Sequence, residues 1–108
     1  MGILTASDFA RLREIRSRRP HEITEALRAR TRREILGADD RMFIVAADHP
    51  ARGALAVGPD ATAMADRYDL LDRLATALSR PGVDGVLGTP DIIDDLAAPG
   101  PLDGKVVV

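Results

Sequence analysis

The sequence lacks several residue types, and each absence narrows what the 108-residue chain can do. It contains no cysteine, which excludes disulfides, thiolate nucleophiles and cysteine-based metal sites within the chain. No apolar run approaches the roughly 18 residues needed to span a bilayer, and the first residues lack the long apolar segment of a secretion signal. We therefore expect a cytoplasmic protein without membrane contacts.

Aromatic residues are also scarce, at 3% of the chain with no tryptophan, and lysine occurs once, at position 105. Net charge is −2, but residues 1–36 are rich in arginine and residues 37–108 are acidic. Because acids interleave with the arginines and no aromatic platform accompanies them, a solvated helical face explains the basic segment better than a nucleic-acid surface. With 45% hydrophobic and 30% charged residues, the composition is that of a folded globular element.

Two helices are predicted in the first third of the chain. The first starts at capping side chains in residues 5–8 and carries apolar residues at every third position. The second starts at Pro20, whose fixed backbone angle suits a first helical turn, and ends before Gly37. We assign residues 1–37 to a helical N-terminal extension. Its inward-facing positions are Phe9, Leu12, Ile15, Ile23, Leu27 and Ile35.

Strands and helices are predicted to alternate over residues 38–108. The apolar run at 42–47 has no alternation, as expected of a parallel strand that is covered on both faces. Repeated βα units of this kind build either a doubly wound sheet or a closed barrel. The further predicted elements are a helix at 60–80, a strand at 83–88, a short helix at 91–98 and the start of a third strand at 105–108.

Polar side chains follow the first two predicted strands directly. Asp48 and His49 end the first strand, Arg52 lies three residues further on, and Thr89 and Asp91 follow the second. Catalytic groups in βα folds lie at these carboxyl ends, where desolvation and neighbouring charges tune a carboxylate. Asp48 and His49 are therefore candidate catalytic residues, and Arg52 and Thr89 are candidate substrate-binding residues.

Structural roles for the same residues remain open. Asp48 can cap its loop by accepting backbone hydrogen bonds, and His49 can bond to a carbonyl group rather than transfer protons. Arg52 either holds a phosphate or carboxylate through its two-pronged guanidinium or is simply solvated. The glycines at 85 and 88 either let substrate or backbone approach closely or serve turn geometry.

Several site classes have no support in the sequence. His49 has no second histidine, aspartate or glutamate at a recognisable ligand spacing, so no metal site is expected. No phosphate-binding GxxxxGK[ST] loop, no GxGxxG and no GxSxG is present, which argues against nucleotide binding and serine-hydrolase chemistry.

The segment MFIVAADHPARG at 42–53 resembles class I aldolases of the DhnA and deoxyribose-phosphate aldolase superfamily, in which the first strand ends in an Asp-His pair. The fuller pattern is similar to an actinobacterial branch, some members of which are encoded with inositol-catabolism genes. Pro50 departs from the glycine usual after Asp-His, which puts the loop shape and any phosphate contact there in doubt. The later segments that share the resemblance are AMADRYDLLDRLATAL and VDGVLGTPDIIDDL.

The resemblance implies a (β/α)8 TIM barrel preceded by two helices, and a lyase of carbohydrate metabolism that works through a Schiff base. The substrate would be a small carbonyl compound, a sugar or keto acid, with or without phosphate. Asp48 would contact substrate or transfer protons beside His49. No cofactor is expected, and the full-length enzyme is expected to be a homo-oligomer.

Length separates this chain from such an enzyme, because a barrel needs about 200 residues or more. The Schiff-base lysine of the family lies on the sixth strand, and Lys105 is no substitute because it begins the third strand, away from the catalytic end. We therefore expect a fragment truncated at strand three and inactive alone. The alternatives are a small non-catalytic α/β interaction module, whose sheet edges pair with another chain, and a TIM-barrel enzyme of another kind.

Overall fold

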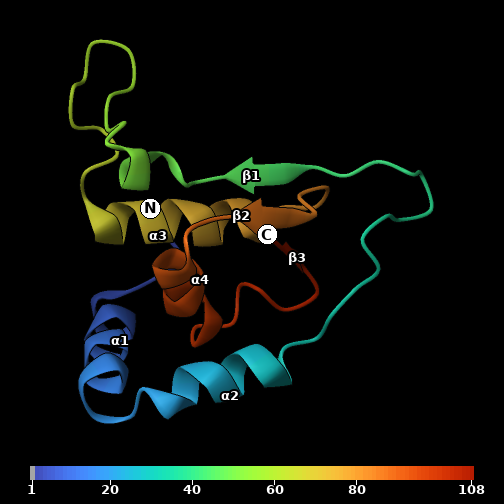
Figure 1. Cartoon of the computed structure of the whole chain (residues 1–108), viewed down its shortest axis with the longest axis horizontal. Coiled ribbons are helices and arrows are strands. Elements are labelled where there is room, and N and C mark those ends of the chain that lie inside the picture. Colours follow the sequence, from blue (N-terminus) through green and yellow to red (C-terminus); the bar gives the residue numbers. More distant parts are fainter. Residues whose placement is uncertain (1) are drawn as a thin grey trace.

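The computed structural model describes residues 2–108, in which helices alternate with parallel strands (Figure 1). The three strands form one parallel sheet in the order β1-β2-β3. No helix within the described residues is long and apolar enough to cross a membrane. The elements in chain order are α1 (Ala6–Arg18), α2 (His21–Ala29), β1 (Ile44–Ala46), the 3-10 helix η1 (His49–Arg52), α3 (Arg67–Leu78), β2 (Gly85–Leu87), α4 (Pro90–Ala97) and β3 (Val106–Val107).

Helix α1 forms where the sequence predicts it, and reciprocal side-chain bonds fix its start. The Thr5 hydroxyl accepts a hydrogen bond from the Asp8 N–H, and the Asp8 carboxylate accepts one from the Thr5 N–H at 2.9 Å. This capping box satisfies two of the N–H groups that the first turn leaves unpaired. Leu12 and Ile15 are buried on the inner face, which confirms the predicted spacing.

Helix α2 ends at Ala29, well before the predicted end near Gly37. Tertiary bonds replace the helical ones at this point, because the Thr31 N–H donates to the Asp103 carboxylate and its carbonyl accepts from the Gly104 N–H. Ile35, which was predicted to face inward on this helix, is 65% exposed in the segment that follows. The boundary of an N-terminal extension at residue 37 stays a prediction.

Helix α3 begins at Arg67 rather than near residue 60, because a tight turn intervenes. Val57 and Asp60 exchange two backbone hydrogen bonds of 2.9 and 3.1 Å, which closes the chain on itself. The Asp66 carboxylate then accepts a bond from the Asp69 N–H and caps the helix. The apolar spacing of this helix predicts an inner face that includes Tyr68, Leu71, Leu74 and Leu78. The three leucines are each at most 3% exposed, which confirms their placement, whereas Tyr68 is 40% exposed.

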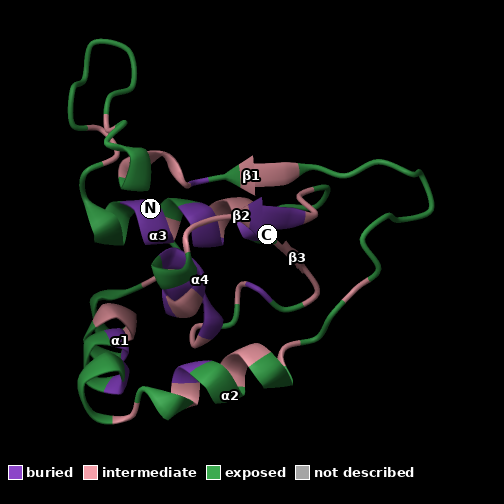
Figure 2. Ribbon diagram, viewed as in Figure 1, coloured by how far each residue is buried: buried purple, intermediate pink, exposed green. Residues whose placement is uncertain are grey.

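The hydrophobic core lies on one face of the sheet. Val45, Val86 and Val107 are register partners, and all three pack with the leucines and isoleucines of α3 and α4. Right-handed crossovers between sequential neighbours place both helices on the same face. Helix α2 packs against α4 and α1 against α2, so a second helical layer lies beyond the first (Figures 1 and 2).

The opposite face of the sheet carries no helix among the described residues. Successive strand residues point to opposite faces, so Ile44, Gly85 and Val106 form one row on this side, with Ala46 and Leu87 in the next. Ala46 is exposed, and Ile44, Leu87 and Val106 are half-buried. The sequence predicts cover on both faces of the first strand, and residues 2–108 supply it on one face only.

The predicted fold class, the N-terminal part of a (β/α)8 TIM barrel, is corrected accordingly. Residues 2–108 form an open α/β arrangement with a three-stranded parallel sheet. Its strands are two or three residues long, and β1 and β3 are free edges rather than parts of a closed ring. Closure into a barrel needs strands that tilt and pair in a continuous circle, which these three do not form.

Gly85 gives a test of the sheet geometry. A Cβ added there would collide with the Val106 carbonyl oxygen, so we expect Gly85→Ala to force β2 and β3 apart. The free energy of unfolding, measured by urea denaturation, should fall by about 1–3 kcal/mol, as in other overpacked interiors. Gly88→Ala is the matched control, because its Cβ would meet Ile92 and Ile93 at 3.4 Å. Equal losses in the two variants would contradict this account of the strand spacing.

Candidate site at the carboxyl ends of the strands

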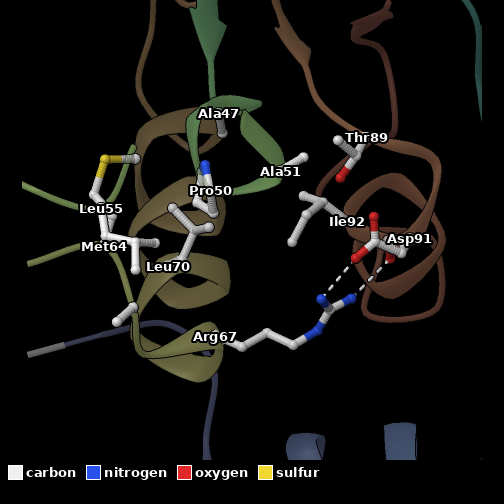
Figure 3. Close-up of a pocket in the computed structure, with 11 residues that line it drawn as sticks. Ala47, Pro50, Ala51, Leu55, Met64, Arg67, Leu70, Thr89, Asp91 and Ile92 are labelled. Atoms are coloured by element: carbon white, nitrogen blue, oxygen red, sulfur yellow. Dashed lines mark hydrogen bonds and ion pairs between the residues drawn. The ribbon is translucent and has the colours of Figure 1, made fainter. Parts of the chain in front are cut away.

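A cavity of about 280 Å³ lies where β1 and β2 end (Figure 3). Its walls come from the end of β1, from η1 and the loop after it, and from the first turns of α3 and α4. The wall is mostly apolar, and Arg67, Thr89 and Asp91 supply its polar part. The lining residues are Ala47, Pro50, Ala51, Leu55, Met64, Ala65, Arg67, Leu70, Thr89, Asp91 and Ile92.

The start of α4 places two of the polar side chains at this cavity. Thr89 is the N-cap residue with extended backbone angles, and Pro90 follows in the first helical position, where its missing N–H is no loss. Asp91 lies in the first turn, near the positive end of the helix dipole. Local sequence therefore fixes both Thr89 and Asp91 at the carboxyl end of β2.

Four charged side chains form a network beside the cavity. Arg67 donates to Asp91 Oδ2 and to Asp95 Oδ2, at 2.7 Å in each case. Arg16 donates to the other oxygen of Asp95 at 2.6 Å. Asp95 is only 5% exposed, so a buried carboxylate lies between two guanidinium groups and ties α1, α3 and α4 together.

Asp91 is held in its ionised form by its neighbours. The Thr89 hydroxyl and the Arg67 guanidinium hold the pKa of the Asp91 carboxyl at about 2. An aspartate in an unfolded chain titrates near pH 3.9. The carboxylate therefore contributes stability above about pH 4, which is lost as the pH falls toward 2.

The predicted catalytic pair lies next to the cavity but does not line it. Asp48 precedes η1 and its side chain caps no helix N–H. His49 Nδ1 lies 3.9 Å from Asp48 Oδ1, which is too long for a hydrogen bond, and this buried nitrogen has no partner among the described residues. The catalytic roles of Asp48 and His49 stay predictions.

The two predicted binding residues are separated by the structure. Arg52 faces Asp48 at 3.4 Å across η1 and is largely exposed, so its guanidinium is engaged within its own loop. Thr89 lines the cavity beside Asp91. The structure thus brings Thr89 and Asp91 together at one wall of the cavity and leaves Arg52 outside it. The binding roles of Thr89 and Arg52 stay predictions.

Two further expectations concern metals and Lys105. The part of the chain that the structure describes contains no cluster of three histidine, aspartate or glutamate side chains that could hold a metal ion. Lys105 precedes β3, and its ammonium donates to the Val83 carbonyl at 2.7 Å. This bond holds the Lys105 ammonium at the amino end of the sheet, away from the cavity at the strand ends.

Sequence reasoning missed the roles of Arg16, Arg67 and Asp95. The apolar spacing over residues 60–80 predicts Arg67 on the polar side of the helix, yet it makes the contacts that join α3 to α4. One signal was present: Asp95 lies among Ile92, Ile93 and Leu96, whose spacing predicts the inward face of the short helix at 91–98. An acid at such a position requires a basic partner, because an unpaired buried charge is costly.

The fold and site together define an open, parallel α/β unit with helices on one face and a small cavity at the strand ends. A family model described as Cgl0159-like matches residues 40–108, and the chain belongs to this family. The crystal structure of Cgl0159 from Corynebacterium glutamicum is 62% identical and superimposes with a TM-score of 0.95 over 99% of this chain. The chain spans 36% of that solved chain. No curated protein matches the sequence significantly.

These comparisons correct the resemblance drawn from the Asp-His segment. The chain is a member of the Cgl0159-like family, and its identification as a fragment of a DhnA or deoxyribose-phosphate aldolase is wrong. The predicted lyase activity, Schiff-base chemistry and link to carbohydrate metabolism and inositol catabolism rested on that resemblance and are withdrawn with it. The Asp-His motif constrains few positions, and adding the two later segments did not lead to the correct family.

The network predicts a large effect at Asp95. We expect Asp95→Ala to lower the free energy of unfolding by about 2–3 kcal/mol, because Arg16 and Arg67 lose their shared buried partner. This is below the loss typical of fully buried pairs, since both arginine side chains are at least 40% exposed. Asp94→Ala on the same helix is the control, because Asp94 makes no ion pair among residues 2–108. A stability change confined to Asp94→Ala would refute the assignment.

Proposed function

We propose that this chain is a non-catalytic α/β interaction module, which binds further polypeptide through the open face of its sheet and the free edge of β1. The proposal rests on the observation that helices cover only one face of the sheet in residues 2–108. All-parallel sheets are normally covered on both faces, because both rows of their side chains are apolar. Here Ile44, Leu87 and Val106 form an apolar surface without a covering layer in the described residues.

The edge of β1 adds hydrogen-bonding groups to this surface. Gly85 N–H bonds to the Phe43 carbonyl and Ala47 N–H bonds to the Leu87 carbonyl, so β2 pairs with alternate groups of β1. The N–H and C=O groups of Ile44 and Ala46 therefore point away from β2. An added strand would satisfy them, which is a common mode of polypeptide recognition.

Exposed apolar side chains continue this surface beyond the strand. Met42, two residues before Ile44, lies on the same face by strand alternation and is 41% exposed. Val108, at the far end of β3, is 58% exposed. Side chains of this size contribute to binding when an apolar partner removes them from water.

The size of the solved relative indicates the kind of partner. About two thirds of the Cgl0159 chain lies outside the region that matches this chain. We propose that polypeptide equivalent to this additional part of Cgl0159, with apolar strand residues of its own, covers the open face and pairs with β1. The proposal includes a cytoplasmic location and contacts with neither nucleic acid nor membrane, as the sequence favours.

Co-expression tests this proposal. The remainder of Cgl0159, outside the segment that matches this chain, should co-purify with this chain. The matched segment of Cgl0159, called here the cognate segment, should also co-purify with that remainder and serves as the positive control. Leu87→Lys should abolish co-purification, because a charge on the open face would be buried without a partner. The matched control is Val57→Lys, which places the same charge at an apolar residue that is 57% exposed in a turn away from the sheet.

Two outcomes would count against the proposal. In one, the cognate segment co-purifies with the remainder of Cgl0159 while this chain does not. In the other, Leu87→Lys and Val57→Lys behave alike. Sedimentation velocity can also show that this chain pairs only with copies of itself through this face. The face would then be a homo-oligomer interface, and the proposed partner would be wrong.

A further inference from the structure

The strand-end cavity has walls suited to an apolar ligand. Leu55 and Met64 from the loop, Leu70 from α3 and Ile92 from α4 line it with methyl and methylene groups. Its volume of about 280 Å³ is close to the lower limit for small-molecule pockets and equals roughly nine waters of bulk liquid. Leu70 and Ile92 belong to the hydrophobic core cluster, so part of the wall is held rigidly by the fold.

One end of the cavity is polar but carries no net charge. Arg67 and Asp91 pair across this end, as the dashed lines in Figure 3 show. Together with Arg16 and Asp95, they form a cluster of two positive and two negative groups. A charged ligand would meet no opposite charge that is free, whereas an uncharged polar group would find hydrogen-bonding atoms.

Those atoms are an acceptor on Asp91 and the hydroxyl of Thr89. Arg67 occupies Asp91 Oδ2, and an ionised carboxylate can accept about four hydrogen bonds in all. The Asp91 side chain is 54% exposed, so a ligand can reach it. The Thr89 hydroxyl lies at the same wall, where it contacts Asp91 and lowers the pKa of that carboxyl, and its oxygen can accept a further hydrogen bond.

We propose that this cavity binds a small uncharged molecule with an apolar body and a hydroxyl group. The hydroxyl donates to the Asp91 carboxylate beside Thr89, and the apolar body contacts Met64, Leu70 and Ile92. This site is separate from the open face of the sheet, because Ala47 and Ile92 at its wall belong to the core on the helical side. Its ligand and the polypeptide partner can therefore be tested independently.

The test is an NMR titration of the 108-residue chain with three ligands of one shape: cyclohexanol, cyclohexylammonium and cyclohexanecarboxylate. Cyclohexanol should shift the methyl signals of Met64, Leu70 and Ile92 and saturate in the millimolar range expected of so small a ligand. The two charged analogues should bind about tenfold more weakly or worse, because each adds an uncompensated charge at the neutral end.

A matched pair of variants localises the binding. Ala51→Leu fills the cavity from η1 and should weaken cyclohexanol binding about tenfold, because it displaces the apolar body. Ala54→Leu adds the same side chain in the same loop at an exposed position outside the cavity lining, and should leave binding unchanged. Unaltered thermal unfolding of both variants shows that the fold is intact.

Three results would overturn the proposal. Cyclohexanol could leave the methyl signals of Met64, Leu70 and Ile92 unshifted at millimolar concentrations. The charged analogues could bind as well as cyclohexanol, which would contradict a neutral site. Ala51→Leu and Ala54→Leu could weaken binding equally, which would place the ligand elsewhere on the chain.

Discussion

The sequence builds a parallel sheet whose two faces are both apolar, yet its helices cover only one of them. This constraint follows from strand order, because two right-handed crossovers between neighbouring strands deliver α3 and α4 to the same side. Val45, Val86 and Val107, one from each strand, pack against these helices. The face that carries Ile44, Leu87 and Val106 has no covering layer among the described residues, and the function we propose rests on it.

A charge network joins three helices on the covered side. Asp95 lies among Ile92, Ile93 and Leu96 of α4 and is tolerated there because two arginines reach it from α1 and α3. The same network supplies the polar end of the strand-end cavity through Arg67 and Asp91. Helix packing and the candidate ligand site therefore depend on one set of ion pairs, and a change at Asp95 should disturb both.

The elements were largely predictable from the sequence, and the errors have identifiable physical causes. Capping side chains and apolar spacing placed α1, and the inward leucines of α3 are buried as expected. Helix α2 was predicted too long because its end is set by tertiary bonds between Thr31 and residues 103 and 104, which local pattern does not encode. At the candidate site, position after a strand singled out Thr89 and Asp91, which line the cavity, and also Asp48, His49 and Arg52, which do not. Arg67 was missed because its partners lie on another helix. The family was misjudged on a motif too short to separate βα proteins from one another.

The most direct measurement of the central claim is the solvent exposure of the open-face residues in the crystal structure of Cgl0159. The match covers 99% of this chain but 36% of the Cgl0159 chain, at 62% identity, so Cgl0159 has polypeptide beyond the match. We expect the side chains aligned with Ile44, Leu87 and Val106 to be buried there by residues from outside the matched region. If those side chains face solvent in that structure, the open face is no docking surface and the proposed function is wrong.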